Sequence, residues 1–137
     1  MRLTKIRLAI ASAATLLVAG GAVAHHSTAM FAWGKEVKLP ATATVERWEW
    51  TNPHTFLYVT VPGAGGEEHW AFEGMSPNHL GRIGWSKRTL TPGQKISLTY
   101  YALKDPRKGG FVVSVTLPGG QTLKQFASPA DDPSKAP

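Results

Sequence analysis

The stretch Arg47-Trp48-Glu49-Trp50-Thr51-Asn52-Pro53-His54-Thr55-Phe56 joins two strand-like segments at an Asn-Pro step. On a strand, Trp48 and Trp50 would point to the same face, because side chains alternate between the two faces of a sheet. Pro53 has no N–H group and drives the preceding residue toward extended geometry, so the first strand should end there. The sequence therefore predicts an aromatic wall, a corner, and the His54 imidazole at the beginning of the next strand.

Outward from this corner, further segments alternate between apolar and polar residues, with one helical interruption. In the first strand, Ala43 and Val45 should face away from Trp48 and Trp50; in the fifth, Phe111 and the alternate residues after it should share one face. The short helix should begin after Ser76-Pro77, since serine caps free N–H groups and proline suits the first turn. We expect strands at residues 41–50, 54–61, 67–73, 95–102, 111–117 and 121–126, and the helix at 78–83.

The predicted order of elements is three strands, a short helix and then further strands. A barrel of the oligonucleotide/oligosaccharide-binding (OB) type has this order. The predicted fold is therefore all-β, β-rich with one short helix, as a small OB-like barrel of five to six strands. A small β-sandwich is the alternative.

The beginning of the chain is typical of an export signal. A basic start, the apolar residues 8–18 and the small-residue sequence Ala22-Val23-Ala24 follow in the order of a cleaved signal peptide. The apolar stretch is too short and too rich in alanine and glycine to favour the alternative of a retained membrane anchor. We expect a signal peptide at 1–24, an N-terminal arm at 25–40, the barrel domain at 41–126 and a disordered tail at 127–137, in a periplasmic or secreted protein without membrane attachment after cleavage.

Charge argues against a nucleic-acid partner. The 137 residues carry 15 Lys+Arg and 9 Asp+Glu, but three of the basic residues lie in the signal, so the mature charge is 12 − 9 = +3. Among the remaining basic residues, Lys87-Arg88 and Arg107-Lys108 are isolated pairs beside turns rather than a clustered stripe. There is no cysteine, so neither a disulfide nor a lipid attachment site is available, and an ordinary core must hold the domain.

All five histidines follow the expected cleavage site. Cleavage after Ala24 would give His25 a free amine, which together with its ring Nδ1 could chelate one ion. A third nitrogen from His54 or His79 would complete a nitrogen-rich tetragonal site, which favours Cu(II). This arrangement resembles the histidine brace of secreted copper proteins. The alternatives are a flexible N-terminus that binds no metal, a His54 that only caps its turn, and an exposed His79. The predicted metal ligands are His25, His26, His54 and His79, with copper as the expected cofactor.

A second set of side chains could bind a planar or sugar-like ligand. Trp48 and Trp50 could form a stacking platform, although a domain of this size also needs such rings in its core. The predicted ligand-binding residues are Trp48, Trp50, Asn52, Glu73 and Asn78, where the alternative for Asn78 is a role in helix capping. Met30 and Met75 are the only methionines beyond the signal, and a Cu(I) site using a tryptophan face would require them to converge.

The sequence carries none of the familiar catalytic motifs: no G-x-S-x-G, no H-E-x-x-H and no glycine-rich phosphate loop. We therefore expect a binding protein rather than an enzyme.

Several motifs together cover residues 25–123. They are His25-His26-Ser27, Glu49-Trp50-Thr51-Asn52-Pro53-His54, Trp70-x-Phe72-Glu73-Gly74-x-Ser76-Pro77-Asn78, Leu80-x-x-x-Gly84-Trp85, Leu90-x-Pro92-Gly93 and Val115-x-Leu117-Pro118-x-Gly120. As a set they resemble a family of small exported bacterial proteins known as domain of unknown function family 6152. The resemblance implies a secreted β-domain and supplies no activity. Gln94 stands where the family pattern leads us to expect aspartate, which affects a turn and no candidate site.

The sequence thus predicts an exported small β-domain that binds a metal ion or small ligand, with copper held through a mature N-terminal histidine. The alternative is an accessory or assembly protein for an exported complex. In that case the Trp48/Trp50–His54 surface would meet a protein partner or a small organic ligand.

Overall fold

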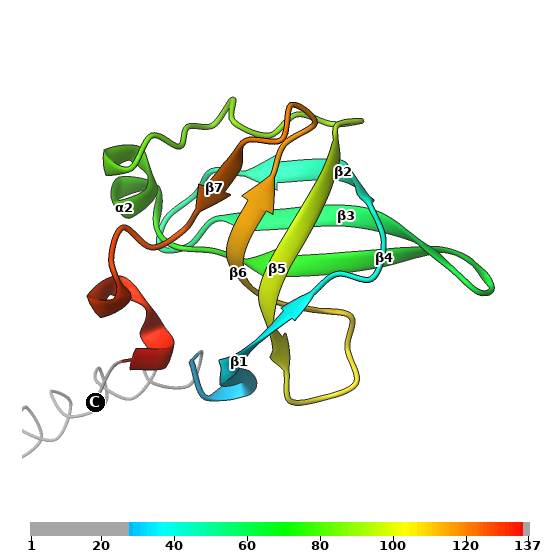
Figure 1. The fold of residues 1–137 in the computed structure, drawn as a ribbon, viewed down its shortest axis with the longest axis horizontal. Coiled ribbons are helices and arrows are strands. Elements are labelled where there is room, and N and C mark those ends of the chain that lie inside the picture. Colours follow the sequence, from blue (N-terminus) through cyan, green and yellow to red (C-terminus); the bar gives the residue numbers. More distant parts are fainter. Residues whose placement is uncertain (1–27, 136–137) are drawn as a thin grey trace, which may run out of the picture.

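The computed structural model describes residues 28–135, which form a small β-barrel with a short helix at one end (Figure 1). The strands are β1 (Phe31–Lys38), β2 (Ala43–Glu49), β3 (Phe56–Gly63), β4 (Gly66–Glu73), β5 (Lys95–Leu103), β6 (Gly109–Thr116) and β7 (Thr122–Lys124). The helix α2 is Pro77–Arg82, and the 3-10 turns are η1 (Thr28–Met30), η2 (Pro129–Asp131) and η3 (Pro133–Lys135).

The barrel closes through the ring β2-β3-β4-β6-β5, with β5 pairing back to β2. All pairs in the ring are antiparallel except β4 with β6. Strand β1 adds to β5, and β7 adds to β6, outside the closed ring. The prediction of a small all-β barrel is confirmed, with α2 between the third and fourth barrel strands as in the OB type, and the alternative sandwich is not formed.

A β-bulge in β2 changes the predicted faces of the first strand. Val45 lies opposite Val59, but Arg47 lies opposite Tyr58, so the regular alternation is interrupted between them. The extra residue turns Trp48 to the same side as buried Val45, and Trp48 packs against the main core. The prediction that Ala43 and Val45 oppose Trp48 was therefore wrong, because simple alternation does not include the inserted residue.

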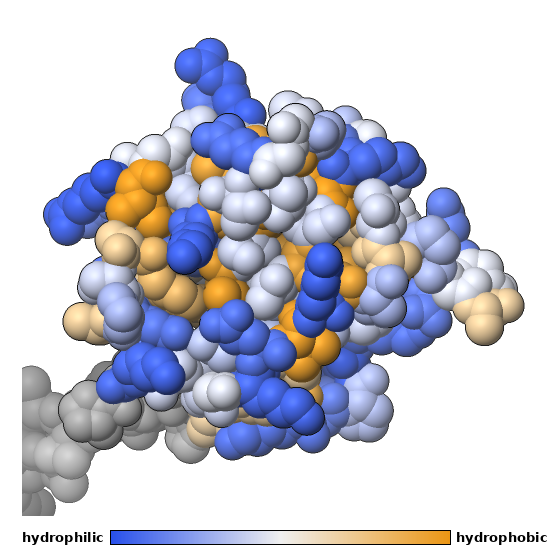
Figure 2. Space-filling model, viewed as in Figure 1, coloured by the Kyte–Doolittle hydropathy of each residue, from blue (hydrophilic) through white to orange (hydrophobic). Residues whose placement is uncertain are grey.

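The interior holds one main core, closed at one end by the α2 region. Leu80, Trp85 and Leu90 from α2 and the loop after it are buried with the inward side chains of the strands. The Trp85 indole N–H donates to the Lys124 carbonyl oxygen at 2.9 Å, which ties this loop to β7. On the face seen in Figure 2, hydrophilic side chains are interspersed with apolar ones rather than gathered on one side.

A second aromatic cluster lies outside the ring. It consists of buried Phe31, Tyr101, Phe111 and Val113, with Met30, Trp33, Met75, Leu103 and Phe126 packed against it. Val112 and Val115 belong instead to the main core. The prediction of one shared face for Phe111 and the residues alternating with it was wrong, because the β5–β6 register shifts between Thr99 and Tyr100. Strand β6 is thus buried on both faces.

The two ends of the described chain are more ordered than the sequence predicts. In the predicted arm, β1 pairs with β5 as part of the sheet. In the predicted disordered tail, η2 and η3 fold back, and the Asp132 carboxylate accepts a hydrogen bond from the Tyr101 hydroxyl at 2.8 Å. Both groups are buried. Within the described residues, this polar segment contacts the barrel through one buried acceptor, a contact that the local sequence pattern does not reveal.

The closure between β5 and β6 leaves no room for a side chain at Gly110. A Cβ atom there would overlap the Tyr101 carbonyl oxygen and press on the Tyr100 ring. We expect Gly110→Ala to lower the free energy of unfolding by about 2–3 kcal/mol, because backbone rather than a flexible side chain must move. Chemical denaturation measures this, with Gly119→Ala as the control, since open space surrounds that position. Equal stability of the two variants would contradict this close packing.

Candidate functional site

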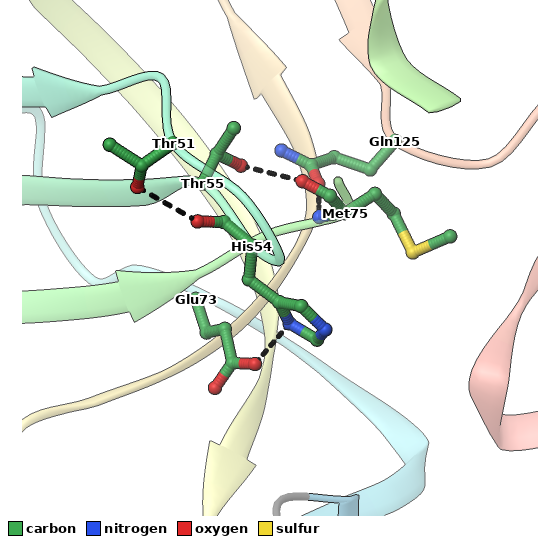
Figure 3. Close-up of polar contacts among 6 residues, drawn as sticks. All are labelled: Thr51, His54, Thr55, Glu73, Met75 and Gln125. Carbon is green, nitrogen blue, oxygen red and sulfur yellow. Dashed lines mark hydrogen bonds and ion pairs between the residues drawn. The ribbon is translucent and has the colours of Figure 1, made fainter. Parts of the chain in front are cut away.

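The corner between β2 and β3 holds the His54 imidazole against the end of β4. The Thr51 hydroxyl donates to the His54 carbonyl oxygen at 3.2 Å, which fixes the backbone of the turn. The buried Nδ1 atom of His54 contacts the Glu73 carboxylate, as Figure 3 shows. The His54 side chain is 32% exposed and that of Glu73 is 15% exposed, so the carboxylate is the more enclosed partner.

Enclosure shapes the acid–base behaviour of Glu73. Burial raises the pKa of Glu73 above its ordinary value of 4.5, because the charged form loses hydration, while the facing His54 imidazole lowers it to a smaller extent. The carboxylate also lines a cavity of about 200 Å³ with apolar Met30, Phe31 and Phe56. The pair therefore combines one partly accessible imidazole with a carboxylate in a largely apolar setting.

The backbone behind this pair is held by a network that reaches across the fold. Both the N–H and the hydroxyl of Thr55 donate to the Met75 carbonyl oxygen, at 3.2 and 2.9 Å. The Met75 N–H donates to Oε1 of fully buried Gln125 at 2.7 Å (Figure 3). The Gln125 carbonyl oxygen in turn accepts from Nε2 of His79 at 2.9 Å. The network joins the corner, the end of β4, helix α2 and the segment after β7.

Gln125 was not among the candidates from the sequence. It lies in a short polar stretch after Gly119-Gly120, where nothing in the local pattern distinguishes a buried amide from an exposed one. The close approach of the Gln125 side chain requires a glycine at position 74. A Cβ atom there would lie 2.6 Å from Thr55 Oγ1 and 2.7 Å from Gln125 Oε1. A glycine at a strand end is nevertheless too common to have predicted a buried amide beside it.

The structure brings some of the predicted residues together and separates others. His54 and Glu73 are in contact, whereas Asn52 and Asn78 are both exposed. His79 lies on α2, where Ser76 caps the helix by accepting from the His79 N–H at 3.2 Å. His25 and His26 lie outside the described residues.

Trp48 and Trp50 do not form an open stacking platform. The ring of Trp48 lies 5.8 Å from those of both Trp50 and Trp85, measured between centroids, and its indole N–H donates to the Ser86 carbonyl oxygen at 3.1 Å. Both Trp48 and Trp50 pack against the main core and are partly buried. Their faces are therefore used largely by the protein itself.

A second histidine–carboxylate pair provides a comparison. His69 on β4 faces Glu46 through Nδ1 at 2.6 Å, and its side chain is 75% exposed. The two pairs share the same chemistry and differ in burial. Solvent screens the exposed pair strongly.

Within residues 28–135, no three His, Asp or Glu side chains come together as a metal site. The nitrogen best placed to bind an ion is Nε2 of His54, since no residue in that range forms a hydrogen bond with it. His79 already uses its Nε2 on the Gln125 carbonyl oxygen. A complete site would need further donors besides this nitrogen.

Comparison with known proteins identifies the family. The sequence model of the Family of unknown function (DUF6152) matches residues 13–112, and the chain belongs to this family. No curated protein and no solved structure matches the chain. The matched range includes all the predicted metal ligands and Glu73, and ends before Gln125. None of the helices in residues 28–135 has the length and apolar character required to cross a bilayer.

The network behind the corner makes a testable prediction for stability. Gln125→Met keeps the length of the side chain but removes the acceptor, which leaves the Met75 N–H buried without a partner. We expect a loss of about 1–3 kcal/mol in the free energy of unfolding, measured by chemical denaturation. Gln121→Met, at an exposed position nearby, should leave stability nearly unchanged. An unchanged free energy of unfolding in Gln125→Met would show that the hydrogen bond to the Met75 N–H does not contribute to stability.

The His54–Glu73 contact makes a second prediction, for the metal-free protein. His54→Asn removes the imidazole that lowers the pKa of Glu73, so this pKa should rise further above 4.5. NMR titration of the carboxyl carbons measures it. The pKa of Glu68, held below its ordinary value mainly by Lys108, should not move.

The same shift has a defined effect on stability. Because the folded protein binds this proton more tightly than the unfolded chain, the contribution of Glu73 to stability falls as pH rises from about 4.5 through the raised pKa. The decline should extend to higher pH in His54→Asn. An unchanged Glu73 pKa in that variant would contradict the coupling.

Proposed function

We propose that this protein is an exported, non-enzymatic binding protein that holds a copper ion at the end of the barrel where His54 lies. The ligands are the amine and ring nitrogen of a mature N-terminal His25 together with Nε2 of His54. The observation that carries the proposal is the enclosed Glu73 carboxylate against Nδ1 of His54.

A carboxylate in this position prepares a histidine for metal binding. Contact with the carboxylate favours the tautomer that carries the proton on Nδ1, which leaves the lone pair of the imidazole on Nε2. Nε2 of His54 forms no hydrogen bond with any described residue, and the side chain is partly exposed. The arrangement therefore supplies one oriented nitrogen ligand that an incoming ion can reach.

The position of the described N-terminal end supports a contribution from His25. The Met30 carbonyl oxygen accepts from the Lys104 N–H at 2.9 Å, and Met30 lines the same cavity as Glu73. The three residues from 25 to 28 can span at most about 10 Å when extended. Met30 brings the described chain to the cavity that Glu73 lines, and the proposal requires the terminal amine to reach the His54 ring from there.

The expected donor set selects the ion. An amine and two imidazole nitrogens around one centre suit tetragonal Cu(II). His26, the next residue in the sequence, is the alternative third ligand. Nε2 of His79 is already hydrogen-bonded to the Gln125 carbonyl oxygen. The proposal thus uses His25 and His54 first and leaves His79 as a structural residue.

The alternative of an accessory or assembly protein remains a prediction. The surface proposed for it includes Trp48 and Trp50, which largely serve the main core. We therefore favour the copper-binding function.

The experiment uses protein that begins at His25, checked by intact mass. We expect it to bind Cu(II) at one site with a nitrogen-rich EPR spectrum, and His54→Asn should weaken binding by about tenfold or more. His69→Asn is the matched control, since this histidine faces a carboxylate in the same way but on the surface. One extra residue before His25 should weaken binding sharply, because it converts the amine into an amide. Unchanged affinity in both the extended protein and His54→Asn would overturn the proposal.

A further inference from the structure

We propose that the same end of the barrel also binds Cu(I), and that Nε2 of His54 and the Met75 sulfur are its ligands. This inference rests on the proposed function in one respect, namely that His54 is a copper ligand. It adds a sulfur donor, which the Cu(II) site does not use.

Backbone pairing places the two residues beside each other. Thr55, which directly follows His54, donates its N–H to the Met75 carbonyl oxygen at 3.2 Å. The Gly74 N–H donates back to the Thr55 carbonyl oxygen at 2.8 Å. These bonds continue the pairing of β3 with β4 beyond the strands themselves. Figure 3 shows the imidazole and the thioether extending from these adjoining backbones, both away from the Thr51–Thr55 turn.

Both side chains also pack against the same aromatic surface. The His54 ring meets Phe111 edge to face, with centroids 6.4 Å apart and an interplanar angle of 86°. Met75 is partly buried against the second cluster, of which Phe111 is a member. The imidazole and the thioether therefore both lie against the second aromatic cluster, although they come from segments outside the strands.

The backbone of Met75 is held more firmly than packing alone requires. Its carbonyl oxygen accepts two hydrogen bonds from Thr55, and its N–H is bound by the buried Gln125 amide. A side chain that only filled space would not need this support, since methionine adapts to irregular gaps. Fixing the backbone at this point limits the positions that the sulfur can occupy relative to His54.

The chemistry of the pair selects the reduced ion. A thioether is a soft ligand that suits Cu(I), and imidazole serves either oxidation state. The Phe111 and Phe126 rings, stacked with centroids 6.3 Å apart, belong to the apolar cluster against which Met75 packs. Cu(II), which prefers several nitrogen or oxygen donors, gains little from Met75, so the two oxidation states should differ in their need for this residue.

The experiment loads the protein beginning at His25 with Cu(I) under anaerobic conditions, in competition with a chromophoric Cu(I) chelator. X-ray absorption should show sulfur scattering around copper in the unmodified protein. Met75→Leu should lose that scattering and weaken Cu(I) binding by about tenfold or more. Met30→Leu is the matched control, because Met30 packs on the same cluster. It should keep both properties.

The outcomes separate this inference from the proposed function. Met75→Leu should leave the Cu(II) EPR spectrum unchanged, as the Cu(II) ligands are nitrogens. Copper(I) bound with sulfur scattering, in a protein that fails to bind Cu(II), would overturn the proposed Cu(II) site and support the present inference. The absence of sulfur scattering in the unmodified protein would overturn the inference, even if Met75→Leu fails to fold. Equal loss of Cu(I) in the Met75 and Met30 variants would also overturn it.

Discussion

The hydrogen bond between the Met75 N–H and the buried Gln125 amide is the contact on which the candidate site depends. Beyond the end of β4 at Glu73, the Gly74 N–H still bonds to Thr55, whereas the Met75 N–H finds its acceptor in Gln125, fifty residues further along the chain. The backbone carbonyl oxygen of Gln125 also accepts from Nε2 of His79, which ties the segment after β7 to α2. Gln125, in the segment after β7, thus helps to set the geometry of the corner at His54.

Comparison of the two histidine–carboxylate pairs explains why the site cannot be found from residue types alone. His54 with Glu73 and His69 with Glu46 have the same groups in contact through the same ring nitrogen. One carboxylate is enclosed and has a raised pKa, and the other pair is exposed. Burial, which depends on the closure of the barrel and on the second aromatic cluster, makes one a candidate ligand site and the other a surface contact.

Much of the fold could be predicted from the sequence, because alternation and turn residues are local signals. The five strands of the closed barrel, the helix after Ser76 and the barrel order follow from them, whereas β1 was predicted only as part of an N-terminal arm. The orientation of Trp48 could not be predicted, because the bulge in β2 is visible only in its pairing with β3. The same holds for Phe111 and for Gln125, whose surroundings come from distant segments. His54 and Glu73 were both singled out, but their contact required the register of β3 with β4.

The buried bond between Tyr101 and Asp132 has a consequence for where the folded unit ends. The prolines and polar residues after Phe126 suggest a natural place to shorten the chain. Such a cut would leave the buried Tyr101 hydroxyl without its carboxylate acceptor and would open the cavity of about 360 Å³ between Val113, Phe126 and the final turns. The shortened protein would present aromatic surface to solvent and tend to self-associate, so the final turns serve to cover that surface.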